Sequence, residues 1–136
     1  MFRLVFVLLL FMNVTHVISQ EKEHLVKSIY FGGGNYYIDE FQVQEVKDFV
    51  QEIPNVQHYV ITVHSHTDNI GGVVYNEWLS EMRSNAAIQI LEDLSIERSM
   101  IERKDFGQFN PVYDNTTYLG RLKNRRVDII FWPITL

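Results

Sequence analysis

Strand-like and helix-like stretches alternate along most of this chain, and this alternation is the strongest constraint on its fold. Two β-rich stretches are each followed by paired or tripled glycines and then by apolar residues at helical spacing. Asp39 is a possible helix cap, and Pro54 a helix end. The order β-α-β-α-β-β predicts an α+β fold with a single mixed sheet and helices packed on it. The expected strands are residues 25–31, 59–64, 100–106 and 125–132, with a loop before the last, and the expected helices run from Asp39 to Pro54 and over about 76–94.

The first residues have the composition of a secretory signal peptide. Arg3 gives a basic start, an apolar run covers residues 4–12, and compact residues precede a possible cleavage site after Ser19. The apolar run is well short of the ~20 residues that a membrane span needs. We therefore predict a signal peptide at residues 1–19 and one domain at residues 20–136.

The charge balance and the lack of cysteine exclude several classes of function. The chain has 12 basic and 17 acidic residues and a net charge of −5, which argues against nucleic acid as its main partner. Without cysteine there is no disulfide, no thiolate metal site and no attachment point for a bacterial lipid anchor. We expect no cofactor.

The stretch V-H-S-H-T-D resembles the start of the zinc site in metallo-β-lactamase-type hydrolases. His64 and His66 alternate on a strand and therefore share a face, so they could bind one metal ion. A catalytic zinc needs a third protein ligand, but Asn69 stands where that pattern has another histidine, and no histidine follows His66. A carboxylate could replace the missing ligand, yet the pattern favours no metal site.

A longer window resembles the peptidoglycan-binding module of OmpA-like proteins, the family of the OmpA, Pal and MotB types. Its motif has the form H-T-D-x-x-G, three residues, then Y-N-x-x-L-S-x-x-R. A second block, N-T-T-Y-L-G-R-L-K-N-R-R-V-D-I at residues 115–129, follows in the same order, and the resemblance covers essentially the whole of residues 20–136. The first block is matched by His66, Thr67, Asp68, Gly71, Tyr75, Asn76, Leu79, Ser80 and Arg83.

The resemblance implies a ligand and two main ligand-binding residues. The family's ligand is the diaminopimelate residue of the peptidoglycan stem peptide, whose free end carries an ammonium beside a carboxylate. Asp68 would bind the ammonium, and the planar guanidinium of Arg83 would grip both oxygens of the carboxylate. On spacing alone, the two residues are better explained as a turn aspartate and a solvated helix charge.

Four other residues are weaker candidates for the same site. Gly34 belongs to a glycine loop that borders the family's pocket, and Thr67 precedes Asp68 in the motif. Asn76 is interpreted first as a helix cap, with a possible contact to the ligand. Arg126 corresponds to an arginine that lies near the family's ligand, and a structural salt bridge explains it about as well.

These features predict a non-catalytic module in the periplasm of a Gram-negative bacterium, because no nucleophile with a paired base is evident. Without a lipid anchor or membrane span, the module would act free or through an envelope protein that supplies attachment to the outer membrane. The alternative is an adapter that uses the fold mainly for protein–protein contact, for which the aromatic pair Phe131-Trp132 could serve.

Overall fold

The computed structural model describes residues 23–134, so the predicted signal peptide at residues 1–19 lies outside the described residues. Within that range, the chain forms four strands, three α-helices and two short 3₁₀ helices. None of its helices has the length and apolar character needed to cross a membrane. In chain order the elements are β1 (Leu25–Tyr30), α1 (Glu40–Gln51), η1 (Val56–His58), β2 (Tyr59–His66), α2 (Val73–Asp93), η2 (Arg98–Met100), β3 (Ile101–Gly107), α3 (Tyr118–Asn124) and β4 (Arg126–Pro133).

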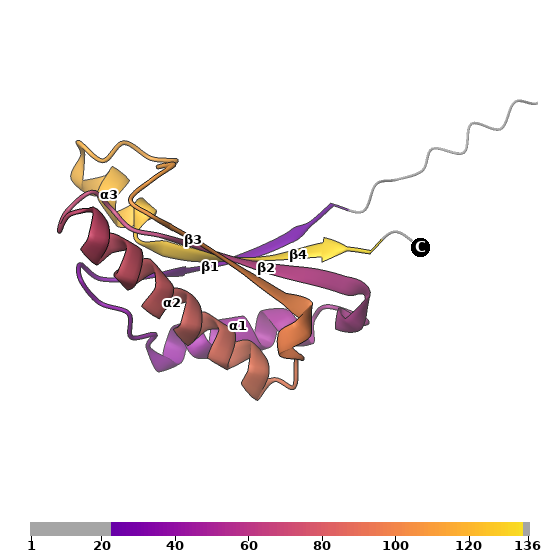
Figure 1. Cartoon of the computed structure of the whole chain (residues 1–136). Helices are drawn as coiled ribbons and strands as arrows, with labels where there is room; N and C mark the ends of the chain where they lie inside the picture. Colours follow the sequence, from indigo (N-terminus) through magenta and orange to yellow (C-terminus); the bar gives the residue numbers. More distant parts are fainter. Residues whose placement is uncertain (1–22, 135–136) are drawn as a thin grey trace, which may run out of the picture.

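The four strands form one mixed sheet in the order β1-β4-β2-β3. β4 pairs antiparallel with both β1 and β2, whereas β2 and β3 run parallel and are joined through α2. Figure 1 shows α1 and α2 on the same face of this sheet. The α+β fold with a single mixed sheet is thus confirmed, and every predicted strand is present.

The core lies between the sheet and the two longer helices. Strand residues alternate in direction, so every second residue of β2 and β4 points toward the helices. The fully buried apolar residues from the strands are Ile29, Ile61, Val63, Val127, Ile129 and Phe131, and those from the helices include Val46, Ala87 and Leu91. Burial of this apolar face is the main stabilising term, at about 25 cal/mol per Å² removed from water.

The first helix begins where the sequence predicts. The Asp39 carboxylate accepts a hydrogen bond from the Gln42 backbone N–H at 2.9 Å, which satisfies one of the free donors at the helix start. The Gln42 side chain also exchanges two hydrogen bonds with the backbone of Tyr30, at 2.8 and 2.9 Å. These contacts fix α1 to the end of β1.

One helix lies in the stretch that was predicted to be a loop. α3 has only seven residues, which is too short to show a helical apolar stripe in the sequence. Its start is set by Thr117, whose hydroxyl accepts a hydrogen bond from the Gly120 N–H at 3.0 Å. Gly120 lies against the backbone of Asp114, where a side chain would not fit.

The aromatic pair near the C-terminus is divided between the two faces of the sheet. Phe131 is fully buried in the core and packs against Phe49 and Tyr59. Trp132 remains 41% exposed on the other face, where its indole N–H donates to the Thr62 hydroxyl at 2.9 Å. Only one member of the pair is therefore available to a partner.

The strand register brings several loops to one end of the sheet. His66, at the end of β2, lies beside both Arg126 at the start of β4 and Gly107 at the end of β3. Tyr30, at the end of β1, also lies beside Arg126. The loops that follow β1 and β2 and the segment that precedes β4 consequently meet there, next to the start of α2.

Candidate ligand-binding site

A pocket of about 220 Å³ opens where these loops meet. It combines the glycine loop after β1, the loop after β2, the first half of α2 and the residue before β4. The structure therefore brings together four of the six predicted site residues, namely Gly34, Thr67, Asp68 and Arg83, and adds Arg125. The lining residues are Gly33, Gly34, Thr67, Asp68, Ile70, Gly71, Tyr75, Leu79, Arg83 and Arg125.

Asp68 is buried and already has two partners. One carboxylate oxygen, Oδ1, accepts a hydrogen bond from the Ile70 N–H at 3.0 Å, which is the turn contact that the sequence suggested. The other, Oδ2, accepts a charge-assisted bond from Arg125 Nε at 2.6 Å. A carboxylate offers about four acceptor sites, so Asp68 keeps capacity for a further donor.

Arg83 is fully buried, which rules out the interpretation as a solvated helix charge. Its guanidinium donates to three backbone carbonyls: Asn35 at 2.8 Å, His66 at 3.1 Å and Gly32 at 3.1 Å. The guanidinium carbon also lies 4.8 Å from the centre of the Phe31 ring. A guanidinium has five N–H donors, so two remain beyond these three bonds.

The charge of Arg83 is not neutralised by a bonded carboxylate. Among residues 23–134, no Asp or Glu lies within 4.0 Å of its guanidinium nitrogens. Burial lowers the pKa of Arg83 to about 10, an effect that the nearby Asp68 partly opposes. Arg83 is still a cation at neutral pH, and it is a buried one.

Thr67 and Asn76 shape the loop that carries Asp68. Thr67 is buried, its N–H donates to the Gly107 carbonyl at 2.8 Å and its hydroxyl to the Asp68 carbonyl at 2.8 Å. Asn76 is fully buried and its amide donates to the same carbonyl at 3.2 Å. The interpretation of Asn76 as a helix cap is wrong, because α2 begins at Val73 and is preceded by Gly72.

A sequence model of the OmpA family matches residues 30–125, which is more than half of the chain. The chain belongs to the OmpA family. The match contains every residue that lines the pocket, from Gly33 to Arg125.

Individual relatives of this OmpA-family chain share only part of their length with it. Outer membrane porin F of Pseudomonas aeruginosa is 36% identical over 95 residues, which are 69% of this chain but 25% of that protein. The outer-membrane lipoprotein YfiB of the same organism is 39% identical over 70 residues, or 52% of this chain and 42% of that protein. The chain thus spans about a quarter of the length of porin F and less than half of YfiB.

Solved structures share the fold of this OmpA-family domain. The peptidoglycan-associated lipoprotein from Burkholderia pseudomallei superposes with a TM-score of 0.67 at 22% identity, covering 77% of this chain and 89% of that one. The periplasmic domain of Helicobacter pylori MotB gives a TM-score of 0.66 at 18% identity, covering 85% of this chain and 80% of that one. At these identities the likeness concerns the fold.

The last predicted site residue, Arg126, lies outside the pocket lining of this OmpA-family domain. Its guanidinium forms a salt bridge with Asp128 at 2.9 Å and lies 5.5 Å from the Tyr113 ring, as the structural alternative proposed. Sequence reasoning missed Arg125, although strand alternation could have found it. Positions 125, 127 and 129 share a direction, and Val127 and Ile129 face the helices.

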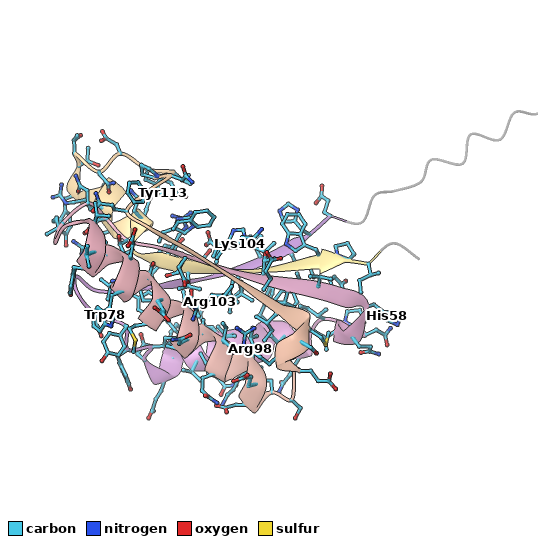
Figure 2. All side chains as sticks on the ribbon, in the orientation of Figure 1. His58, Trp78, Arg98, Arg103, Lys104 and Tyr113 are labelled. Atoms are coloured by element: carbon cyan, nitrogen blue, oxygen red, sulfur yellow. The ribbon has the colours of Figure 1, made fainter. Side chains whose placement is uncertain are left out.

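The two histidines of the H-x-H-x-D motif lie on the sheet face that α1 and α2 leave uncovered. Figure 2 shows Lys104, which lies beside His64 in the strand register, above the sheet, on the side away from the two helices. His66 stacks on Phe106 with ring centres 5.0 Å apart, and His64 meets the same ring edge-on at 5.4 Å. Among the residues that the structure describes, no group of three or more His, Cys, Asp or Glu is placed to hold a metal ion.

Burial lowers the pKa of His66 to about 4, with a smaller effect from Arg126. The Asp128 carboxylate, 3.9 Å from His66 Nε2, opposes the shift. His66 is therefore neutral at physiological pH, and it contributes packing to the sheet rather than charge.

Proposed function

We propose that this domain binds peptidoglycan non-covalently and without catalysis, holding the zwitterionic end of diaminopimelate in the stem peptide. Asp68 accepts hydrogen bonds from the ligand ammonium. Arg83 grips the ligand carboxylate. Thr67 and Gly34 form the walls between them.

The observation that carries this proposal is the buried cation of Arg83 beside a small open pocket. A buried charge without a bonded counterion is costly, and a ligand carboxylate would supply that counterion. The planar guanidinium suits a carboxylate because two parallel N–H donors can meet its two oxygens. Lysine would offer only a point charge.

Arg125 adds a second cation, so the pocket holds two guanidinium groups and one carboxylate. This excess of positive charge favours a ligand that brings a carboxylate. The ammonium next to it can still reach Asp68, since the carboxylate has acceptor sites beyond those used by Ile70 and Arg125. A zwitterion with adjacent charges satisfies both requirements.

Family membership supports peptidoglycan as the larger ligand and a place in the cell envelope. Among the relatives are a peptidoglycan-associated lipoprotein and the periplasmic domain of a MotB protein, together with two outer-membrane proteins. We place this domain in the periplasm of a Gram-negative bacterium, exported by residues 1–19, with an envelope partner supplying attachment to the outer membrane. N-terminal sequencing of periplasmic protein, expected to begin near Gln20, tests the export.

A sacculus pulldown tests the function. Purified protein should sediment with peptidoglycan sacculi, and Asp68→Ala should raise the dissociation constant for sacculi by at least tenfold, since a charge-assisted bond is worth ~1.5–3 kcal/mol. Asp93→Ala, at the exposed far end of α2, is the matched control and should bind as the wild type does. Full binding by a folded Asp68→Ala protein would favour the adapter alternative, in which the pocket is secondary.

A further inference from the structure

Three partly exposed aromatic side chains lie next to one another beside the pocket. Tyr36 meets Trp78 edge-on with ring centres 5.8 Å apart, and Tyr75 lies 5.7 Å from the same ring at a tilt. Tyr36 is 41% exposed, Tyr75 40% and Trp78 45%. Figure 2 shows Trp78 beside the first turns of α2, next to the loop that joins β1 and α1. We call Tyr36, Tyr75 and Trp78 the aromatic platform.

The platform is continuous with the pocket because Tyr75 belongs to both. Two glycines make room for its ring. A Cβ atom at Gly71 would lie 2.6 Å from Tyr75 Cδ1, and one at Gly34 would lie 3.1 Å from its hydroxyl. Trp78 follows three residues later on α2, at a rise of roughly 4.5 Å along the helix. A ligand that leaves the pocket past Tyr75 therefore meets Trp78 next.

The pocket holds only the end of the proposed ligand. Its volume of about 220 Å³ is below the ~300–1,000 Å³ of pockets that enclose a whole small molecule. Diaminopimelate is the third residue of a stem peptide whose first residue is joined to an amino sugar of the glycan strand. At ~3.3–3.6 Å per extended residue, the backbone between diaminopimelate and that sugar spans at most roughly 10 Å, and the diaminopimelate side chain adds to this length. The sugar therefore lies outside the pocket, on the side from which the peptide leaves.

We propose that the aromatic platform binds the amino sugar that carries the stem peptide, an inference that rests on the proposed function. The faces of the rings carry negative partial charge, and the C–H bonds on one face of a pyranose meet them with positive partial charge. The tyrosine hydroxyls and the indole N–H provide polar groups for the sugar hydroxyls. Trp78 and Tyr36 therefore extend the site from the peptide to the glycan.

The size of the platform fits a sugar better than a protein partner. An aromatic side chain offers ~150–250 Å² in full, so three rings that are less than half exposed present roughly 200–300 Å² together. A stable protein interface needs about 800 Å² on each side. One or two pyranose rings match the smaller area.

The contributions of the platform and of the pocket to binding can be distinguished by measuring the affinity for two ligands. One is the free stem peptide with diaminopimelate, and the other is the same peptide attached to its disaccharide. The wild type should bind the disaccharide peptide more tightly, and Trp78→Ala should weaken that binding by roughly three- to twelvefold. The same variant should leave the affinity for the free peptide unchanged, and Trp78→Phe should retain most of the binding. Trp132→Ala, on the opposite face of the sheet, is the control and should change neither affinity.

Tryptophan fluorescence gives a second test of sugar binding, and this test keeps Trp78 in place. The chain has two tryptophans, so Trp132→Phe leaves Trp78 as the single reporter. Its emission should change on adding the disaccharide peptide and stay constant with the free peptide.

The outcomes distinguish the two proposals. If the wild type binds neither ligand, the proposed function fails. If it binds both with equal affinity, or if Trp78→Ala weakens both equally, the pocket stands and the platform is not a sugar site. An unchanged Trp78 emission with the disaccharide peptide would overturn the platform in the same way.

Discussion

Asp68 and Arg125 form the shortest ion pair of the pocket, with Nε and Oδ2 2.6 Å apart and both side chains mostly buried. Such a pair pre-arranges the carboxylate for a ligand. It also means that a ligand ammonium joins an occupied carboxylate and must share it. The energetics of this pair therefore set how much of the binding energy is available at Asp68.

A double-mutant cycle measures the coupling energy between Asp68 and Arg125. Asp68→Ala and Arg125→Ala should each destabilise the fold, with a coupling energy of about 1.5–3 kcal/mol from denaturant unfolding, because the bond is charge-assisted and partly buried. The more exposed pair Lys27–Glu45, at 3.5 Å, is the control and should couple by less than about 1 kcal/mol. Additive effects at Asp68 and Arg125 would show that the pair is not formed in solution.

Arg83 has a structural role in addition to the binding role that we propose. Its three hydrogen bonds join the loop after β1 to the end of β2. Arg83→Ala would remove these three hydrogen bonds, which are worth ~1.5–3 kcal/mol each because the donor is charged; the Gly32 carbonyl would keep the Asn35 N–H as a donor. A loss of binding in that variant could result from the missing ligand contact or from the disturbed loop. Asp68→Asn disturbs the loop less, since the amide oxygen can still accept from Ile70, although the variant loses the charge-assisted bond to Arg125.

His66 makes the stability of the domain depend on pH. Its pKa is about 4 in the folded protein and about 6.5 in an unfolded chain. Between these values the unfolded chain binds the additional proton, so the free energy of unfolding falls as the pH falls. We expect a loss of roughly 2 kcal/mol from neutral pH to pH 5 from this group. His64, whose pKa is also lowered by burial, adds in the same direction.

Urea unfolding at pH 7.5, 6.5, 5.5 and 5.0 checks this expectation. His66→Gln should be less stable than the wild type at pH 7.5 and should show a shallower decline toward pH 5. If the free energy of unfolding fell equally steeply with pH in the two proteins, His66 would not be the source of the pH dependence.

At the scale of single elements, α2 is divided into two halves with different tasks. Its first half buries the polar residues Asn76, Ser80 and Arg83, which bond to the loops and strand ends around the pocket. Its second half buries Ala87, Ile88 and Leu91 against the sheet. One helix thus anchors in the core and carries the site at its free end.

Gly71 and Gly72 lead into this helix and should respond differently to alanine. Both have positive φ, +106° and +84°, so each substitution costs on the order of 1–3 kcal/mol in backbone strain. Only at Gly71 would the added Cβ also clash with the Tyr75 ring. At Gly72 nothing lies within 4 Å of an added Cβ.

In a Tyr75→Ala background, the cost of Gly71→Ala should therefore fall by about 1 kcal/mol or more, whereas the cost of Gly72→Ala should stay the same. Thermal or denaturant unfolding of the wild type, the three single variants and the two double variants gives these values. An equal cost of Gly71→Ala in both backgrounds would mean that Tyr75 does not pack against Gly71.

The elements with long apolar patterns were predictable from the sequence, whereas the local contacts of the site were not. The strands and the two longer helices follow from apolar spacing and from caps such as Asp39. α3 was not predicted, because two helical turns are too short to show an apolar stripe in the sequence. The ion pair between Asp68 and Arg125 joins residues 57 positions apart, and only the strand register brings them together. Family resemblance named Asp68 and Arg83, and it pointed to Arg126 where the pocket contains Arg125.

At the scale of the whole molecule, the pocket and the uncovered sheet face are separate surfaces. The pocket is lined by residues of the loops at one end of the sheet and of the first half of α2, and Figure 1 shows the start of α2 beside that end of the sheet. The uncovered face carries Trp132 and the pair of Asp128 and Arg126. The envelope partner that we propose would therefore have a surface of its own, separate from the proposed peptidoglycan site.

The central claim is that one zwitterionic group is held between Asp68 and Arg83, and isothermal titration calorimetry with two peptides tests it most directly. One stem peptide carries diaminopimelate, and the other carries lysine, which has the ammonium but lacks the adjacent carboxylate. The wild type should bind the lysine peptide roughly ten- to a hundredfold more weakly, because a charge-assisted contact to Arg83 worth ~1.5–3 kcal/mol is missing. Asp68→Asn should weaken binding of the diaminopimelate peptide by a similar factor. Equal affinity of the wild type for the two peptides would contradict the claim.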